Sequence, residues 1–169
     1  MTSTVLQPAA RPASGRTATA SPFAPNAGVA DGLADRISWP LIRVATGLIL
    51  VPHGAQKLFG VFGGHGLGGT AQFFEQSLGL YPGLVFAGLA GATEFFGGLL
   101  LAAGLLTRPA AAAIVALMAY AAFAVHLGNG FFWTSGGLEY PLLWGLVALA
   151  IAIRGGGPLS LDRKLGLPV

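Results

Sequence analysis

Four apolar stretches dominate the chain, and polar or glycine-rich segments separate them. They run roughly over residues 37–60, 82–106, 107–127 and 140–153. A transmembrane helix needs about 20 predominantly apolar residues, so the first three stretches are long enough to cross a bilayer. The fourth is shorter and crosses if its neighbours tilt or the bilayer thins. The pattern therefore predicts an all-α fold, an integral membrane four-helix bundle.

A glycine-rich segment and a short apolar stretch connect the first two spans. Five glycines occur over residues 63–69, and Phe73, Phe74 and Leu78 then fall on one side of a predicted helix over residues 71–80. At about ten residues, with a rise of about 1.5 Å each, this helix is too short to cross. We expect a short interfacial or re-entrant helix between spans one and two.

One domain and two tails account for the whole chain. Residues 1–35 are rich in Ala, Pro, Ser and Thr and contain no apolar run, so they cannot bury enough surface to fold. They also lack the hydrophobic region of a cleaved secretory signal. We expect a disordered cytoplasmic tail over 1–35, a four-helix transmembrane domain over 36–155 and a short cytoplasmic tail over 156–169.

The distribution of lysine and arginine predicts the orientation in the membrane. Seven basic residues fall in segments that share one side, and the two opposite loops contain none. By the positive-inside rule that side is the cytoplasm, so both chain ends are cytoplasmic in a multi-pass protein of the plasma membrane. The seven are Arg11, Arg16, Arg36, Arg108, Arg154, Arg163 and Lys164.

Composition supports a lipid environment and excludes several kinds of chemistry. The chain has 54% hydrophobic and 9% charged residues, with a mean hydropathy of +0.71, whereas soluble domains carry about 25% charged residues. Cysteine is absent, which excludes disulfides, thiol catalysis and cysteine-ligated clusters in this polypeptide. The basic residues are scattered, so the lipid bilayer is the expected partner and nucleic acid is not. No zinc-ligand spacing or phosphate loop is present, so no metal site is predicted.

Two charged side chains fall well inside the predicted spans. Arg43 in span one and Glu94 in span two would each cost about 2.5–3.5 kcal/mol in lipid, so both should face the bundle interior. Helical spacing places Arg43, His53 and Lys57 near one face of span one. The helix rise puts Glu94 between the depths of Arg43 and His53.

Two interpretations of these groups stay open. In the first, Arg43 and Glu94 form a buried structural ion pair, while Lys57 extends to the outer headgroups. In the second, a polar cavity opens outward and handles protons or a quinone head group. The side chains around that cavity would be His53, Lys57, Glu94 and His126.

The remaining candidate residues have simpler expected roles. His65 lies in the glycine-rich loop and should be solvated. Glu139 should cap the fourth helix, because an acid suits a helix N-terminus, or else belong to the cavity. Phe95 and Trp133, with Phe59 nearby, could stack on a flat ring. Two histidines at similar depth could also ligate haem, but two of three histidines often share a side, so haem is not expected.

Three sequence runs carry a resemblance to a known family. They are LIRVATGLILVPHGAQKLFG (Leu41–Gly60), GGTAQFFEQSLGL and ATEFFGGLLLAAGLLTRPAA (Ala92–Ala111). They contain, in order, an intramembrane arginine, a His-Gly-x-x-Lys element and a glutamate followed by paired glycines. In these features the chain resembles the DoxX family of small four-helix membrane proteins over roughly residues 37–153. The motif positions here are Arg43, His53, Gly54, Lys57, Glu94, Gly97 and Gly98.

The resemblance implies a subunit of a membrane oxidoreductase system, linked to quinone and assembled with protein partners in a membrane redox complex. Related proteins act in thiosulfate oxidation coupled to quinone. On this hypothesis His53 and Glu94 manage quinol protons, and Lys57 or Arg43 stabilises negative charge on a quinone oxygen. The residues expected to bind the quinone are His126, Phe95 and Trp133. The alternative is a non-catalytic membrane module that docks partner proteins or transports a small solute.

Overall fold

A computed structural model describes residues 30–167, and all regular structure in that range is helical, as predicted. Several helical segments follow one another without a break. The segments are α1 (Ala30–Phe59), α2 (Gly66–Leu78), α3 (Gly83–Ala92), the π-helical η1 (Thr93–Gly97), α4 (Gly98–Ala103), α5 (Thr107–Tyr120), the π-helical η2 (Ala121–His126), the 3-10 turns η3 (Leu127–Asn129) and η4 (Trp133–Ser135), α6 (Glu139–Arg154) and α7 (Leu161–Lys164).

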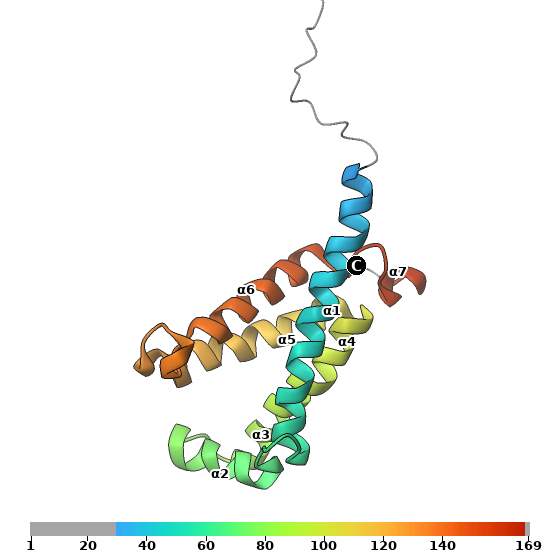
Figure 1. The fold of residues 1–169 in the computed structure, drawn as a ribbon. Coiled ribbons are helices and arrows are strands. Elements are labelled where there is room, and N and C mark those ends of the chain that lie inside the picture. The colour runs from blue at the N-terminus through green and yellow to red at the C-terminus, as the bar shows by residue number, and fades with distance from the viewer. Residues whose placement is uncertain (1–29, 168–169) are drawn as a thin grey trace, which may run out of the picture.

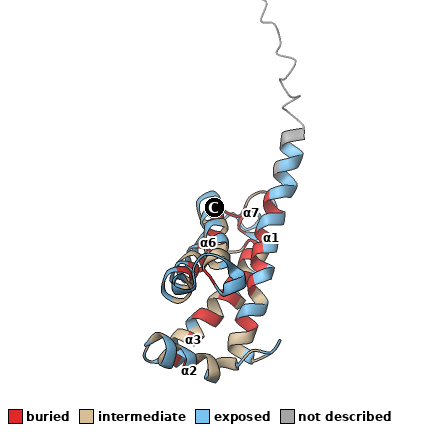
Figure 2. Ribbon diagram, turned by 60° about the vertical axis from the view of Figure 1, so that its left-hand side comes forward, coloured by how far each residue is buried: buried red, intermediate tan, exposed pale blue. Residues whose placement is uncertain are grey.

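The long helices are arranged in pairs (Figure 1). α1 packs along the continuous rod of α3, η1 and α4, and α5 packs along α6. The pairs meet at the end where α7 lies and diverge toward the opposite end, where α2 lies against α3. We call these the α7 end and the α2 end. Figure 2 shows buried positions on the facing sides of the helices and exposed positions on their outer sides.

Two of the described helices are long and apolar enough to cross a membrane. They are the rod over Gly83–Ala103 and the rod over Thr107–Asn129, of 21 and 23 residues. They correspond to the predicted second and third spans. The predicted first and fourth spans form α1 and α6, but neither of these helices passes the same test of length and composition, and α6 has 16 residues.

Some helix boundaries differ from the predicted ones. α1 begins at Ala30, inside the stretch predicted as a tail, and the rest of that stretch, residues 1–29, lies outside the described residues. The short helix predicted over 71–80 is longer and starts earlier, as α2. The additional N-terminal turn begins at Gly66, so the second half of the glycine-rich segment is helical.

Glycines allow α1 to lie very close to the rod over Gly83–Ala103, which we call the second rod because it corresponds to the predicted second span. A β-carbon on Gly47 would collide with the carbonyl oxygen of Gly98, and one on Gly54 would collide with the backbone of Phe95. The reverse contact is also too close for a side chain, since a β-carbon on Gly98 would lie 2.7 Å from the carbonyl oxygen of Gly47. Such small-residue contacts are typical of helices that associate in membranes, where close packing replaces the hydrophobic effect.

Arg43 binds the end of α4 and not Glu94, so the predicted ion pair of these residues is wrong. Its guanidinium Nη1 donates to the carbonyl oxygens of Leu101 and Ala102 at 2.6 and 2.7 Å, and Nη2 donates to that of Leu159 at 3.2 Å. The last carbonyls of a helix have no partner within it and carry partial negative charge, so they attract a cation. The helix ends at Ala103, level with Arg43, which the continuous span assumed from the sequence did not anticipate.

The predicted C-terminal tail folds back and caps α5. The Asp162 carboxylate accepts hydrogen bonds from the backbone N–H of Leu106 at 2.7 Å and of Thr107 at 2.9 Å, and its own N–H donates to Gly104 at 2.8 Å. An acid therefore meets the positive N-terminus of α5, as Arg43 meets the negative C-terminus of α4. Gly104, at a φ of 70°, leaves the space that the guanidinium occupies.

Trp39 attaches the end of α6 to α1. Its indole N–H donates to the carbonyl oxygen of Gly155 at 2.9 Å, and the guanidinium carbon of Arg154 lies 4.5 Å from the ring centroid. Cation–π contacts of this kind contribute about 0.5–2 kcal/mol. The α7 end is therefore held by polar contacts from α1, the second rod, α6 and the C-terminal segment.

We expect Asp162→Asn to destabilise the protein by about 1–3 kcal/mol, because an amide cannot accept both α5 hydrogen bonds. Burial raises the pKa of Asp162, but the Thr107 hydroxyl, the two backbone N–H groups and the charge of Arg43 outweigh it, so the pKa lies below its ordinary value. The ionised carboxylate therefore stabilises the fold above its unfolded pKa of about 3.9, and this contribution is lost as the pH falls through the lower folded value.

Thermal melts in detergent at neutral and acidic pH test this expectation. The melting temperature of the parent should fall below about pH 4, and that of the asparagine variant should fall less over the same pH interval. Equal acid sensitivity of the two proteins would contradict the role given to Asp162.

Candidate functional site

A cavity of about 460 Å³ lies at the α2 end, where the helix pairs diverge. Its walls come from α1, the α3–η1 junction, α5, η2 and α6, and α2 contributes Phe73, Phe74 and Leu78. Most of the lining is apolar or aromatic. Five of the seven predicted site residues line it, namely His53, Lys57, Glu94, His126 and Trp133.

Lys57 and Glu94 form a salt bridge in the wall of this cavity. The distance from Lys57 Nζ to Glu94 Oε2 is 2.6 Å, and the two side chains are 28% and 7% exposed. Lys57 thus replaces Arg43 as the partner of Glu94 and does not simply extend to the headgroups. The tight contact of Gly54 with the second rod, one turn before Lys57, makes this pairing possible. Oε1 of Glu94 has no hydrogen-bond partner among residues 30–167 and is not fully enclosed.

Two π-helical segments contribute polar groups to the cavity. Glu94 lies in η1, and His126 ends η2. A π-turn is wider than an α-helical turn and occurs mostly as a single-turn bulge, frequently at functional sites. The sequence reasoning assumed regular helices and missed both segments, for which residue spacing provides no clear signal.

The imidazole of His126 is oriented by the loop that precedes α6. Its Nδ1 lies 2.6 Å from the carbonyl oxygen of Gly136, which also accepts from the Asn129 amide at 3.2 Å. A carbonyl only accepts, so Nδ1 carries the proton and Nε2 of the neutral ring is left as an acceptor. His53 is exposed, and its imidazole makes no hydrogen bond to any other residue that the structure describes.

Stacked aromatic rings form a second wall. The rings of Trp133 and Tyr140 lie 5.3 Å apart between centroids and only 7° from parallel. Glu139 is the first residue of α6, where an acid was expected, but it makes no capping hydrogen bond within the helix. Its carboxylate accepts the backbone N–H of Trp133 at 3.0 Å, beside the cavity, and does not line it. The sequence reasoning missed Tyr140 and also Trp144, which lines the cavity one turn further along α6.

Arg43 and Phe95 lie apart from the cavity. Phe95 packs edge-on against Phe59 and Phe96, with centroid distances of 5.2 and 5.1 Å. Arg43 lies at the α7 end, and an apolar core that includes Leu50, Ile114, Met118 and Ile151 separates the two ends. These two residues therefore have structural contacts in place of the cavity positions expected for them.

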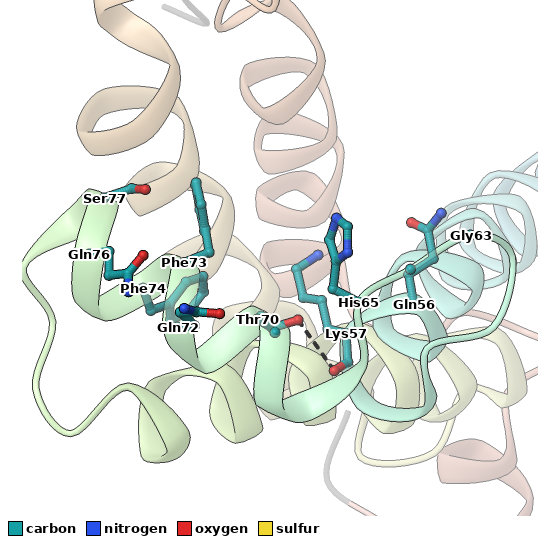
Figure 3. A pocket seen from close by; sticks show the side chains of 12 residues that line it. Gln56, Lys57, Gly63, His65, Thr70, Gln72, Phe73, Phe74, Gln76 and Ser77 are labelled. Atoms are coloured by element: carbon teal, nitrogen blue, oxygen red, sulfur yellow. Dashed lines mark hydrogen bonds between the residues drawn. The ribbon is translucent and has the colours of Figure 1, made fainter.

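A second, more polar cavity adjoins the first (Figure 3). It measures about 670 Å³, and α2 supplies one side while the end of α1 and the glycine-rich loop supply the other. His65 lines it and is exposed, as expected for a solvated residue. Lys57 lines both cavities, as do Phe73 and Phe74. The Lys57 amine therefore lies between the buried Glu94 carboxylate and the polar cavity.

The arrangement suits exchange of protons with a polar atom on an otherwise apolar molecule. The first cavity offers a carboxylate oxygen, an ammonium group and two imidazoles within aromatic walls. Such sites, apolar with a few convergent polar groups, are typical of ligand binding. No cluster of three or more His, Asp or Glu side chains that could hold a metal ion occurs in residues 30–167.

Comparison with known proteins agrees with the resemblance noted in the sequence. A family model described as DoxX matches residues 38–127. A protein of Haemophilus influenzae described as uncharacterized is 39% identical over 106 residues, which cover 58% of this chain and 79% of that protein. No solved structure shows significant similarity to the chain. The matched range covers nearly all of the first three predicted spans and ends just after His126.

The Lys57–Glu94 salt bridge predicts strong coupling between these two positions. Lys57→Met leaves a buried carboxylate without its cation and should destabilise the protein by about 1–3 kcal/mol, less than for a fully buried pair because Lys57 is partly exposed. The double variant with Glu94→Gln should recover part of this loss in thermal melts.

Arg43→Gln combined with Glu94→Gln provides the matched control. Because these residues lie on opposite sides of the apolar core, their effects should add. Coupling of Glu94 to Arg43, with none to Lys57, would contradict the observed pairing.

Proposed function

Since the chain belongs to the DoxX family, we propose that it is a four-span protein of the plasma membrane with both ends in the cytoplasm. The four spans would be α1, the rod over 83–103, the rod over 107–129 and α6. Helix α2 would lie at the outer interface. The charge distribution supports this orientation, because five exposed basic residues lie away from the α2 end. They are Arg36, Arg108, Arg154, Arg163 and Lys164. Among the described residues of the α2 end, the one basic residue of the lysine or arginine type is Lys57, and it is paired with Glu94.

We further propose that the first cavity binds the head group of a quinone or quinol and that the protein is a subunit of a quinone-linked oxidoreductase. The observation that carries this proposal is the Lys57–Glu94 pair in the wall of an aromatic-lined cavity of about 460 Å³. A quinone ring is flat and apolar, and its two oxygens need a hydrogen-bond donor in the oxidised state and an acceptor in the reduced state. Stacked rings and convergent polar groups meet both needs.

Each polar group then has a definite role. Lys57 donates a hydrogen bond to a quinone carbonyl oxygen and stabilises the negative charge that develops on reduction. His126 Nε2 and Glu94 Oε1 accept from the hydroxyls of the quinol and take up its protons. His53, exposed at the rim, passes protons to water. Oxidation of quinol releases two electrons as well as two protons, so the electrons pass to a redox group on a partner subunit.

The apolar core between the ends supports this proposal over solute transport. Leu50, Ile114 and Met118 are each less than 7% exposed and lie between the cavity and the α7 end. A polar solute would have to cross this core to pass through the protein. The cavity therefore has the form of a site that is open toward one end.

The orientation predicts which positions are accessible from outside. Because the chain has no native cysteine, single cysteines at the exposed positions Gln72, Thr134 and Lys164 are clean probes. An impermeant thiol reagent on intact cells should label the first two and should label Lys164→Cys only after lysis. Labelling of Lys164→Cys on intact cells would contradict the proposed topology.

Quinone binding is tested with the protein in lipid nanodiscs and a short-chain quinone analogue. The analogue should quench tryptophan fluorescence, because Trp133 and Trp144 line the cavity. His126→Ala and His53→Ala should weaken binding by about tenfold or more, equivalent to about 1.4 kcal/mol.

The control variant is His65→Ala, which alters a histidine of the adjoining polar cavity and should bind as the parent does. Folding of each variant is checked by its melting temperature. If well-folded His126→Ala and His53→Ala proteins bind like the parent, or if the parent does not bind, the quinone proposal fails and a docking role gains support.

A further inference from the structure

The C-terminal segment over 159–165 buries two polar side chains and exposes three leucines. Ser160 and Asp162 are buried at 0% and 3% exposure, whereas Leu159, Leu161 and Leu165 are 61%, 37% and 63% exposed. This is the reverse of the pattern expected for a segment that faces water. The exposed leucines therefore need an apolar environment outside the protein.

The segment is held in this orientation by hydrogen bonds on its buried side. The carbonyl oxygen of Leu159 accepts from Arg43, and Asp162 binds the backbone on both sides of the turn between α4 and α5. The Ser160 hydroxyl accepts the N–H of Arg163 and caps α7. The leucines are thus fixed outward at the level where α4 ends and α5 begins.

Basic side chains surround these leucines. Arg163 and Lys164 lie between Leu161 and Leu165 in the chain and are exposed, and Arg108 is exposed next to the α5 cap that Asp162 forms. From residue 140 to 169 the sequence has one acidic residue, Asp162, and its carboxylate is buried and occupied by backbone N–H groups. The surface therefore combines exposed basic side chains with exposed apolar side chains.

We propose that this surface, made of Leu159, Leu161, Leu165, Arg108, Arg163 and Lys164, binds acidic phospholipids of the inner leaflet. The leucines enter the upper part of the acyl region, and the three basic groups contact the phosphates of the headgroups. Acidic membrane surfaces attract clustered lysine and arginine near the hydrocarbon boundary. The side of the membrane rests on the topology proposed above, but the lipid chemistry does not.

Lipid bound here should stabilise the whole protein and not only the tail. The segment is bonded to Arg43 on α1 and to the junction of α4 with α5, so lipid that binds the folded segment shifts the folding equilibrium toward the native state.

The test compares full-length protein in nanodiscs of phosphatidylcholine with the same protein in mixed phosphatidylcholine and phosphatidylglycerol. The parent should melt on the order of 5 °C higher in the acidic mixture, and high salt should reduce the difference. The combined variant Arg108→Gln, Arg163→Gln and Lys164→Gln should lose most of this difference. Arg36→Gln, which removes an exposed charge from α1, should retain it.

Equal melting temperatures of the parent in the two lipid mixtures would overturn the proposal. The proposal would also be overturned if Arg36→Gln lost as much of the melting-temperature difference between the two lipid mixtures as the triple variant does, because that would indicate a general charge effect. Nanodiscs present both lipids on both faces, so the result does not depend on orientation, and failure here is separate from failure of the topology or of quinone binding.

Discussion

The close approach of α1 to the second rod determines how the polar groups of the two helices meet. Gly47 and Gly54 contact the backbone of that rod so tightly that no β-carbon fits. This contact fixes the height of α1 relative to its neighbour and so decides which polar groups meet. Lys57 reaches Glu94 beyond one end of the contact, and Arg43 reaches the last carbonyls of α4 beyond the other.

The two ends use polar groups in opposite ways. At the α7 end, Arg43 and Asp162 are bound to the termini of α4 and α5, so the charges stabilise the fold and are shielded from any ligand. At the α2 end, one oxygen of Glu94, the Nε2 of His126 and the exposed His53 face or border a cavity without a protein partner among the described residues. These groups are not fully enclosed by protein, so a ligand in the cavity can contact them, which is why the cavity is the candidate functional site.

Sequence reasoning succeeded where a regular helix was enough and failed where a helix changed or ended. Hydrophobic stretches located the long helices, and helical spacing placed His53 and Lys57 on one side of α1. The partner of Arg43 was missed because the end of α4, with Gly104 in a left-handed conformation, was read as a continuing span. The capping role of Asp162 was missed because it joins residues more than 50 positions apart. Tyr140 and Trp144 were missed because only tertiary packing brings α6 opposite Glu94.

We propose that the cavity between α1, η1, η2 and α6 binds a flat ring with ionisable oxygens. An experimental structure of the protein in lipid with a bound quinone analogue tests it most directly. We expect ring density between the Trp133–Tyr140 stack and the Lys57–Glu94 pair, with one ring oxygen within hydrogen-bond distance of Lys57 and the other close to His126. Density for the analogue at another site, with this cavity filled only by lipid chains or water, would contradict it.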